Sequence, residues 1–231
     1  ADGNVYLGDQ SLDPEVALIA ETGFDYVTET AYIRPTVYIR QIDDFIQGTP
    51  FDDTPGVADS LEEMMASMHG SAAALLRFTN VDARLYGFDL DAGMDLPGRL
   101  RADAVLSYVR GERRDLDEDL YRIAPPSLTA GLTWEGDLWS ATFETRAVAE
   151  QDKVSQTLQE AGTPGHVTLS LYGDWQVKDG VRLSAGVENL LDQITRDHLS
   201  GYNRNAYGDV AIGTRLPGAG RGAFVRLSFV G

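Results

Sequence analysis

The chain has 231 residues, of which 43% are hydrophobic and 24% charged, so its composition is that of a folded protein rather than a disordered one. It contains no cysteine, which excludes disulfides, thiolate metal sites and cysteine nucleophiles. The 19 basic and 36 acidic residues give a net charge of -17, and so acidic a chain repels phosphate backbones. We therefore expect no nucleic-acid partner.

The opening residues 1–11 are polar and resemble no signal peptide, because they lack a basic region followed by an apolar one. No stretch of the chain has the roughly 18 apolar residues of a transmembrane helix. A membrane-spanning barrel stays open at this point, because its strands alternate and leave only a weak hydropathy signal.

A strand with a change of phase is predicted at 81–96, after a long polar connection at about 48–80. Its apolar residues occupy odd positions before Tyr86 and even positions after Gly87. Two explanations fit this change of phase. Either a bulge near Gly87 restores one face, or the strand leaves the apolar layer above Tyr86 and both of its faces meet water.

The second half alternates apolar and polar residues with a period of two, which is typical of strands and not of helices. The charged residues of these segments, such as Arg101 and Glu144, share the polar face. The predicted strands are 100–109, 128–134, 139–147, 167–177, 181–187 and 225–229.

Short and long connections alternate along the chain. The short ones are 27–30, 97–98, 135–137 and 178–180, and the long ones lie at about 48–80, 111–126, 151–165 and 190–220. Outer-membrane barrels require this alternation, and aromatic residues such as Trp134 and Trp139 flank a short turn as in an interfacial belt. The sequence therefore predicts an all-β fold: an up-and-down antiparallel portion of a transmembrane β-barrel, with about nine strands, short periplasmic turns and long extracellular loops.

Several motifs resemble one family. They are Gly-Val-Glu-Asn-Leu-Leu-Asp at 186–192, Asp-His-Leu-Ser-Gly-Tyr-Asn at 197–203, Leu-Pro-Gly-Ala-Gly-Arg at 216–221 and the last strand at 224–229. Leu-Asp-Pro-Glu at 12–15 and the strands 38–46 and 80–89 are similar to the family's earlier barrel segments. Together they resemble a TonB-dependent outer-membrane receptor over nearly the whole chain.

The resemblance implies a receptor in the outer membrane of a Gram-negative bacterium, surrounded by lipid and lipopolysaccharide. Such receptors are barrels of about 22 strands around an N-terminal plug, through which the TonB complex acts. Because residues 1–231 show neither plug nor TonB box, they are expected to form a C-terminal segment of the barrel domain. The implied function is import of a scarce metal chelate, with a ferric siderophore favoured and copper as the alternative.

Two other classes compete with this interpretation. A small stand-alone outer-membrane barrel of about eight to ten strands would be structural or adhesive and would transport nothing. A soluble lipocalin-like binder is the least favoured of the three classes, because its charged side chains should face outward rather than into the barrel.

No catalytic constellation is found, so we expect neither an enzyme nor a cofactor. The three histidines lie in predicted loops or at strand starts, and His198 is interpreted as a structural loop residue. The serines form no nucleophile elbow, and acidic pairs such as Asp43 and Asp44 are ordinary in so acidic a chain.

One segment of the first long connection suggests a metal site. Ser60 and Glu63 form a capping box, which predicts a short helix with Met65, Met68 and His69 on one face. Thioether and imidazole groups together suit Cu(I). The same methionines could instead pack the helix onto the barrel mouth, and we favour that interpretation.

The last long connection supplies candidates for binding a siderophore. Tyr202, Arg204 and Tyr207 combine aromatic and guanidinium groups in one loop. A loop of this composition looks the same whether it binds cargo or covers the barrel mouth.

Overall fold

The computed structural model describes residues 5–50, 75–205, 207 and 209–229, and over these ranges the chain forms strands and no helix. In the same ranges there is accordingly no helix long and apolar enough to span a membrane.

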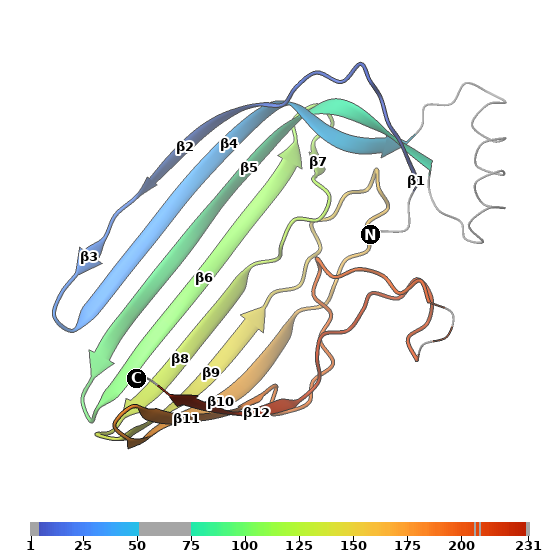
Figure 1. The fold of residues 1–231 in the computed structure, drawn as a ribbon. Helices are drawn as coiled ribbons and strands as arrows, with labels where there is room; N and C mark the ends of the chain where they lie inside the picture. Colours follow the sequence, from blue (N-terminus) through green and yellow to red (C-terminus); the bar gives the residue numbers. More distant parts are fainter. Residues whose placement is uncertain (1–4, 51–74, 206, 208, 230–231) are drawn as a thin grey trace.

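Nine strands follow one another across a single sheet, each antiparallel to its neighbour (Figure 1). In spatial order they are β12 (Gly222–Phe229), β11 (Val181–Glu188), β10 (His166–Lys178), β9 (Trp139–Val148), β8 (Ser127–Glu135), β6 (Leu100–Arg113), β5 (Leu75–Leu96), β4 (Ala31–Pro50) and β2 (Val16–Gly23). This order confirms the predicted up-and-down arrangement of about nine strands. The sheet is curved and is not closed over the described residues.

Three short strands pair with members of this nine-stranded sheet. β3 (Tyr26–Val27) pairs with the start of β4, and β7 (Glu118–Asp119) pairs with the end of β6. β1 (Val5–Leu7) runs parallel to the beginning of β5.

The cross-strand register separates an apolar face from a polar one, because directly paired residues point to the same side of a sheet. One apolar row crosses seven strands through Met94, Ala102, Leu132, Phe143, Leu171, Val187 and Ala223. The adjacent row on the other face passes through Gly93, Asp103, Gly131, Glu144 and Ser170. The predicted alternation therefore holds across the sheet.

The apolar face has no protein packed over its middle. Leu132, Phe143 and Leu171 are neighbours in one row and are 43%, 43% and 47% exposed. Adjacent large apolar side chains that are this exposed require an apolar environment outside the protein.

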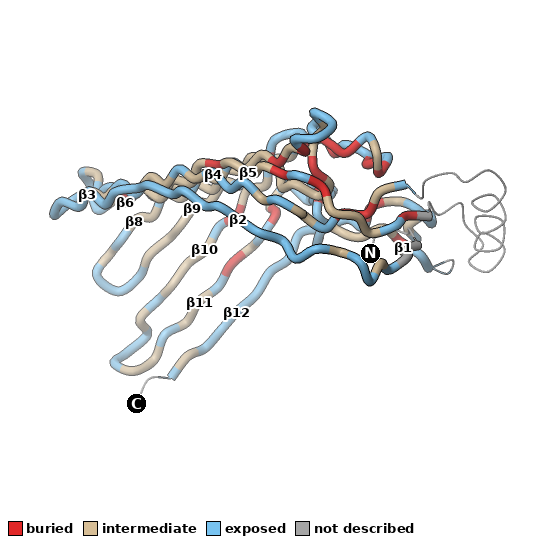
Figure 2. The backbone as a smooth tube through the Cα atoms, turned by 90° about the horizontal axis from the view of Figure 1, so that it is seen from above, coloured by how far each residue is buried: buried red, intermediate tan, exposed pale blue. Residues whose placement is uncertain are grey.

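The buried core lies at one end of the molecule, where the long connections gather (Figure 2). Its apolar members are Leu76, Val81 and Ala83 of β5, Val148 at the end of β9, and Leu120, Val154 and Leu158 from the connections. The opposite end carries only short turns, as expected. Gly98 and Gly180 occupy positive φ angles there (83° and 74°), which lets the chain reverse within a few residues.

The predicted bulge near Gly87 is wrong. Gly87 pairs regularly with Tyr38 on one side and Val109 on the other. The irregularity lies in the neighbouring strand β4, where the register shifts between Ile42 and Phe45. Asp44 sits in this bulge at φ 59°, a conformation that aspartate tolerates better than most residues.

The alternative is that both faces of β5 meet water before Tyr86. This is wrong for one face. Val81 and Ala83 are 6% and 0% exposed, because they lie beneath the long-connection end. The other face does become polar and carries Asp82 and Arg84 at its surface. The change of hydrophobic phase in the sequence thus marks the point where β5 enters the buried core.

Glycines on the polar face make room for tyrosines of the adjacent strand. A Cβ on Gly93 would lie 2.5 Å from the ring of Tyr32, whose hydroxyl hydrogen-bonds to Asp91 (3.1 Å) and Asp103 (3.3 Å). A Cβ on Gly131, in the same row, would meet nothing closer than 3.9 Å. The space above Gly93 therefore allows the Tyr32 ring to lie flat on the sheet.

We predict that Gly93→Ala destabilises the intact protein in detergent micelles by about 1–3 kcal/mol, because the added methyl displaces Tyr32 and breaks its hydrogen bonds. Urea unfolding followed by tryptophan fluorescence measures this change. Gly131→Ala is the matched control and should shift the free energy of unfolding by less than about 0.5 kcal/mol. Equal effects of the two substitutions would contradict the packing argument.

Candidate functional site

Three long connections meet at the end of the sheet opposite the short turns. They are residues 114–126 between β6 and β8, 149–165 between β9 and β10, and 189–221 between β11 and β12. Because each strand pair brings its own connection to this end, residues far apart in sequence become neighbours there (Figure 1).

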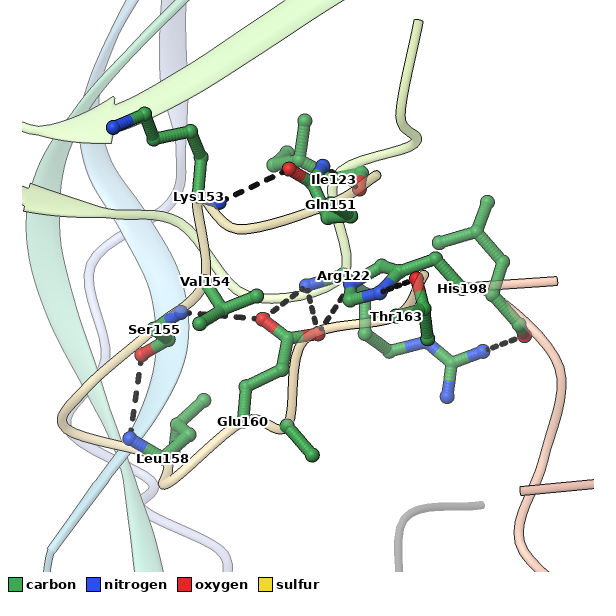
Figure 3. A network of polar contacts seen from close by, with 12 residues as sticks. Arg122, Ile123, Gln151, Lys153, Val154, Ser155, Leu158, Glu160, Thr163 and His198 are labelled. Carbon is green, nitrogen blue, oxygen red and sulfur yellow. Dashed lines mark hydrogen bonds and ion pairs between the residues drawn. The ribbon is translucent and has the colours of Figure 1, made fainter. Parts of the chain in front are cut away.

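A buried polar network joins the three connections (Figure 3). Its centre is a contact of 3.0 Å between His198 Nε2 and Glu160 Oε1, in which the two side chains are 0% and 2% exposed. The same carboxylate accepts hydrogen bonds from the backbone N–H groups of Arg122 (3.1 Å) and Ser155 (3.2 Å). Buried carboxylates persist only when paired in this way, so Glu160 holds the connections together.

The other ring nitrogen of His198 lies 3.1 Å from the Thr163 hydroxyl. In the neutral ring, a carboxylate at Nε2 selects the tautomer that donates there, so Nδ1 accepts from Thr163. Hydroxyl, imidazole and carboxylate in this order also occur in hydrolases. Here Thr163 is 6% and His198 2% exposed, which leaves no access for a substrate, so the arrangement is structural. The structural role predicted for His198 is confirmed.

Arg215 ties the last connection to itself and, through a 3.4 Å hydrogen bond to the Ala161 carbonyl, to its neighbour. Its guanidinium donates to the backbone carbonyls of His198 and Ser200 and to the hydroxyl of Tyr202 (2.7 Å). Its Cζ atom lies 4.7 Å from the centre of the Tyr202 ring. With Arg215 only 7% exposed, Tyr202 serves as one wall of a buried guanidinium site.

Glu118 of β7 forms a second polar contact between the connections 114–126 and 149–165. Its carboxylate accepts from the Ser155 hydroxyl (2.9 Å), the Thr157 backbone N–H (2.6 Å) and the Thr157 hydroxyl. Burial acts to raise the pKa of Glu118, but the hydrogen bonds from Thr157 and Ser155 outweigh it and the pKa is lowered. The ionised carboxylate is therefore the form that holds these loops.

The two motifs that carry the strongest sequence resemblance meet at the base of the last connection. Asn189 donates to the Gln193 carbonyl and accepts from the Gln193 N–H, both at 2.9 Å. Asp192 accepts from the backbone N–H of Arg221 at 2.8 Å. The motifs thus fasten the start of this 33-residue connection (189–221) to its end, which explains why these residue types stand at these positions.

The structure separates the residues predicted to bind cargo. Arg204 is exposed and Tyr207 is 98% exposed, whereas Tyr202 packs on Arg215. Met65, Met68 and His69 lie outside the described residues. Within the described ranges, no group of three or more His, Asp or Glu side chains is arranged to hold a metal ion.

Sequence reasoning missed Glu160, Thr163, Glu118 and Arg215 as members of the buried network. No local pattern marks them, because each acts through a partner 35 or more residues away or through backbone groups. One sequence signal exists for Arg215 alone. Basic residues are few in so acidic a chain, so an arginine within a loop is a candidate for a specific structural contact.

A family model described as "TonB dependent receptor-like, beta-barrel" matches residues 1–190. The chain belongs to the TonB-dependent receptor family. In this family the short turns face the periplasm, the long connections face the cell exterior, the apolar face meets lipid and the polar face lines the barrel interior. The predicted fold class and family are both confirmed.

Solved structures of receptors share the fold of this chain. The copper transporter OprC shares 28% sequence identity with this receptor chain at a TM-score of 0.82, covering 95% of this chain and 32% of its own. The siderophore receptor PirA from Acinetobacter baumannii shares 16% identity at a TM-score of 0.65, covering 97% and 33%. A mutant of the ferric enterobactin receptor PfeA from Pseudomonas aeruginosa shares 19% identity at 0.67, covering 99% and 34%.

This receptor chain thus spans about a third of the length of the structures it matches. Among curated protein sequences, none matches it.

We predict that His198→Ala in the intact receptor loosens the last long connection, because the buried Glu160 carboxylate loses a hydrogen-bond donor. Leaving a buried carboxylate without such a donor costs about 3 kcal/mol, which corresponds to about a hundredfold faster amide hydrogen exchange in residues 189–205. Tyr207→Ala, which removes an exposed side chain from the same loop, should leave exchange unchanged. Unchanged exchange in the His198 variant would show that the pair does not hold the loop.

A second prediction concerns the effect of low pH on the connection between β9 and β10. Because the pKa of Glu118 is lowered from its ordinary value of 4.5, its stabilising effect is complete above pH 4.5 and is lost as the pH falls through the lowered value. Exchange in residues 151–165, corrected for intrinsic rates, should rise over this range. The Glu118→Gln variant should show the fast exchange already at neutral pH, and an equal acid response in both proteins would contradict the assignment to Glu118.

Proposed function

We propose that residues 1–231 form the C-terminal part of the barrel of an outer-membrane TonB-dependent transporter that imports a scarce metal. The family assignment supports this, and the sheet has the two faces that such a wall needs. The polar face, with Asp103 and Glu144, would line the barrel interior, while the row through Phe143 and Leu171 would meet lipid.

The remaining parts of the transporter would come from the rest of a longer receptor. Its N-terminal plug would fill the barrel and engage the TonB complex, and further strands would pair with β2 and β12. The apolar face would contact outer-membrane lipid, and the surface above it lipopolysaccharide, in a Gram-negative bacterium.

Copper is the cargo that we propose. Sequence analysis favours a ferric siderophore, but OprC is a copper transporter and resembles this chain in sequence as well as in fold. The residues Met65, Met68 and His69 offer thioether and imidazole groups suited to Cu(I) within five positions of the sequence.

A ferric siderophore is the second candidate. PirA and PfeA are named as siderophore and ferric enterobactin receptors, and at 16% and 19% identity they support a shared fold alone. The favouring observation is the exposure of Arg204 and Tyr207, which present a guanidinium and an aromatic ring on the last loop. Both groups suit a large, anionic, ring-containing chelate.

The buried network serves either cargo in the same way. Loops that are folded before the cargo arrives lose less conformational entropy on binding, so the network of Glu160, His198 and Arg215 would increase affinity without touching the cargo.

The test compares cargo binding and uptake by the intact receptor. Changing Met65→Leu, Met68→Leu and His69→Ala together should abolish Cu(I) binding and copper uptake, because only one candidate ligand, the thioether of Met64, remains in that segment. A second variant, Arg204→Gln with Tyr207→Ala, should leave copper uptake unchanged.

Heat-modifiable migration on gels checks that both variants retain the barrel. If the methionine variant binds and imports copper as the unchanged receptor does, the copper proposal is wrong. Loss of ferric siderophore uptake in the Arg204 and Tyr207 variant would then establish the second candidate.

A further inference from the structure

Cross-strand register identifies the polar face of the sheet at the end where the long connections lie. Ala83 of β5 pairs with Arg113 of β6, and Arg113 pairs with Glu118 of β7, so these three side chains share one face. Because β5 and β6 pair from Ala83 to Leu96 without a register shift, this is also the face of Asp103. In the proposed transporter it is the interior face of the barrel.

The connection between β9 and β10, residues 149–165, folds over that interior face, and we call it the inner layer. Glu118 accepts hydrogen bonds from the Ser155 hydroxyl (2.9 Å) and from the backbone N–H of Thr157 (2.6 Å). Its wall partner Arg113 is only 5% exposed. The inner layer therefore does not stand upright above the wall but lies across it, on the side where cargo would pass.

A small apolar core fixes this arrangement. Gly111, another interior-face residue of β6, leaves room for two side chains of the preceding connection, since a Cβ there would lie 2.7 Å from Ile123 and 2.9 Å from Leu120. Leu120, together with Val154 and Leu158 of the inner layer, is less than 10% exposed. A segment with buried apolar side chains and buried hydrogen bonds opens rarely, so the inner layer is a fixed part of the wall.

A layer packed on the wall takes space from the open end of the barrel where the long connections lie. Packed layers of backbone lie about 10 Å apart, so the inner layer moves the edge of the passage inward by about that distance. We propose that the inner layer is a size filter at this opening, which admits a metal ion or a small metal complex and holds back a bulky chelate. This inference deepens the proposed transport function and rests on it, and it favours copper over a ferric siderophore as cargo.

The test uses the intact receptor with Arg146→Cys as a reporter, in a chain that has no cysteine of its own. Arg146 is exposed on the interior face and lies two residues before Val148, next to which the inner layer begins. A small maleimide added from outside should label position 146. The same maleimide on a long polyethylene glycol chain should react at least about tenfold more slowly, because it must wait for the inner layer to open. Both rates are expressed relative to those at the exposed position of Tyr207→Cys.

A widening variant replaces residues 152–162 with Asn-Gly. Gln151 and Thr163 already pair across the inner layer through two backbone hydrogen bonds (2.9 and 3.1 Å), so a two-residue turn can join them. In this variant the two reagents should label position 146 at equal relative rates.

The matched control shortens the last connection instead. It replaces residues 204–213 with the same turn between Asn203 and Thr214, which share a backbone hydrogen bond of 2.8 Å. The difference between the reagents should persist in this control. Heat-modifiable migration on gels checks that both shortened proteins retain the barrel. Glu118→Gln, which loosens the inner layer without removing it, is a second variant and should raise the rate of the large reagent several-fold.

Equal relative rates of the two reagents in the unchanged receptor would overturn the proposal, as would a failure of the small reagent to react. An equal gain in the widening and control variants would also overturn it, and so would import of a ferric siderophore by the unchanged receptor as fast as copper. Labelling requires no cargo, so copper uptake measured in parallel shows a failure of the transport proposal separately.

Discussion

The structure depends on one constraint: a sheet that crosses a lipid bilayer must pair its backbone groups internally and present an apolar side to the lipid. Nine antiparallel strands satisfy the first requirement through continuous ladders. The row through Leu132, Phe143 and Leu171 satisfies the second. Over the described residues no protein packs on the middle of that face, and the buried side chains concentrate at the end of the sheet where the long connections gather.

Those loops are held by polar rather than apolar contacts. Glu160, His198 and Arg215 are each less than 10% exposed and hydrogen-bond to one another or to backbone N–H and carbonyl groups. A mostly hydrophilic loop cannot bury enough apolar area to order itself, so buried charge-assisted hydrogen bonds take that role. The result is that the three long connections are tied to one another by buried polar contacts.

Much of the fold could be predicted from sequence, because strand alternation and connection length are local signals. The turns at Gly98 and Gly180 and the face of Glu144 are examples. The bulge is predicted in the wrong strand, because the change of phase in β5 marks its entry into the buried core and carries no information on the register shift in β4. The Glu160–His198 pair could not be predicted, because it depends on how two loops 38 residues apart meet.

The central claim is that one face of this sheet meets lipid and the other lines a polar lumen. Since the chain has no cysteine, single substitutions such as Phe143→Cys and Glu144→Cys place a fluorophore on either face of one strand of the intact receptor. Lipids carrying a quencher on their acyl chains should quench the label at position 143 strongly and the label at 144 weakly. Equal quenching at both positions, or stronger quenching at 144, would contradict the account.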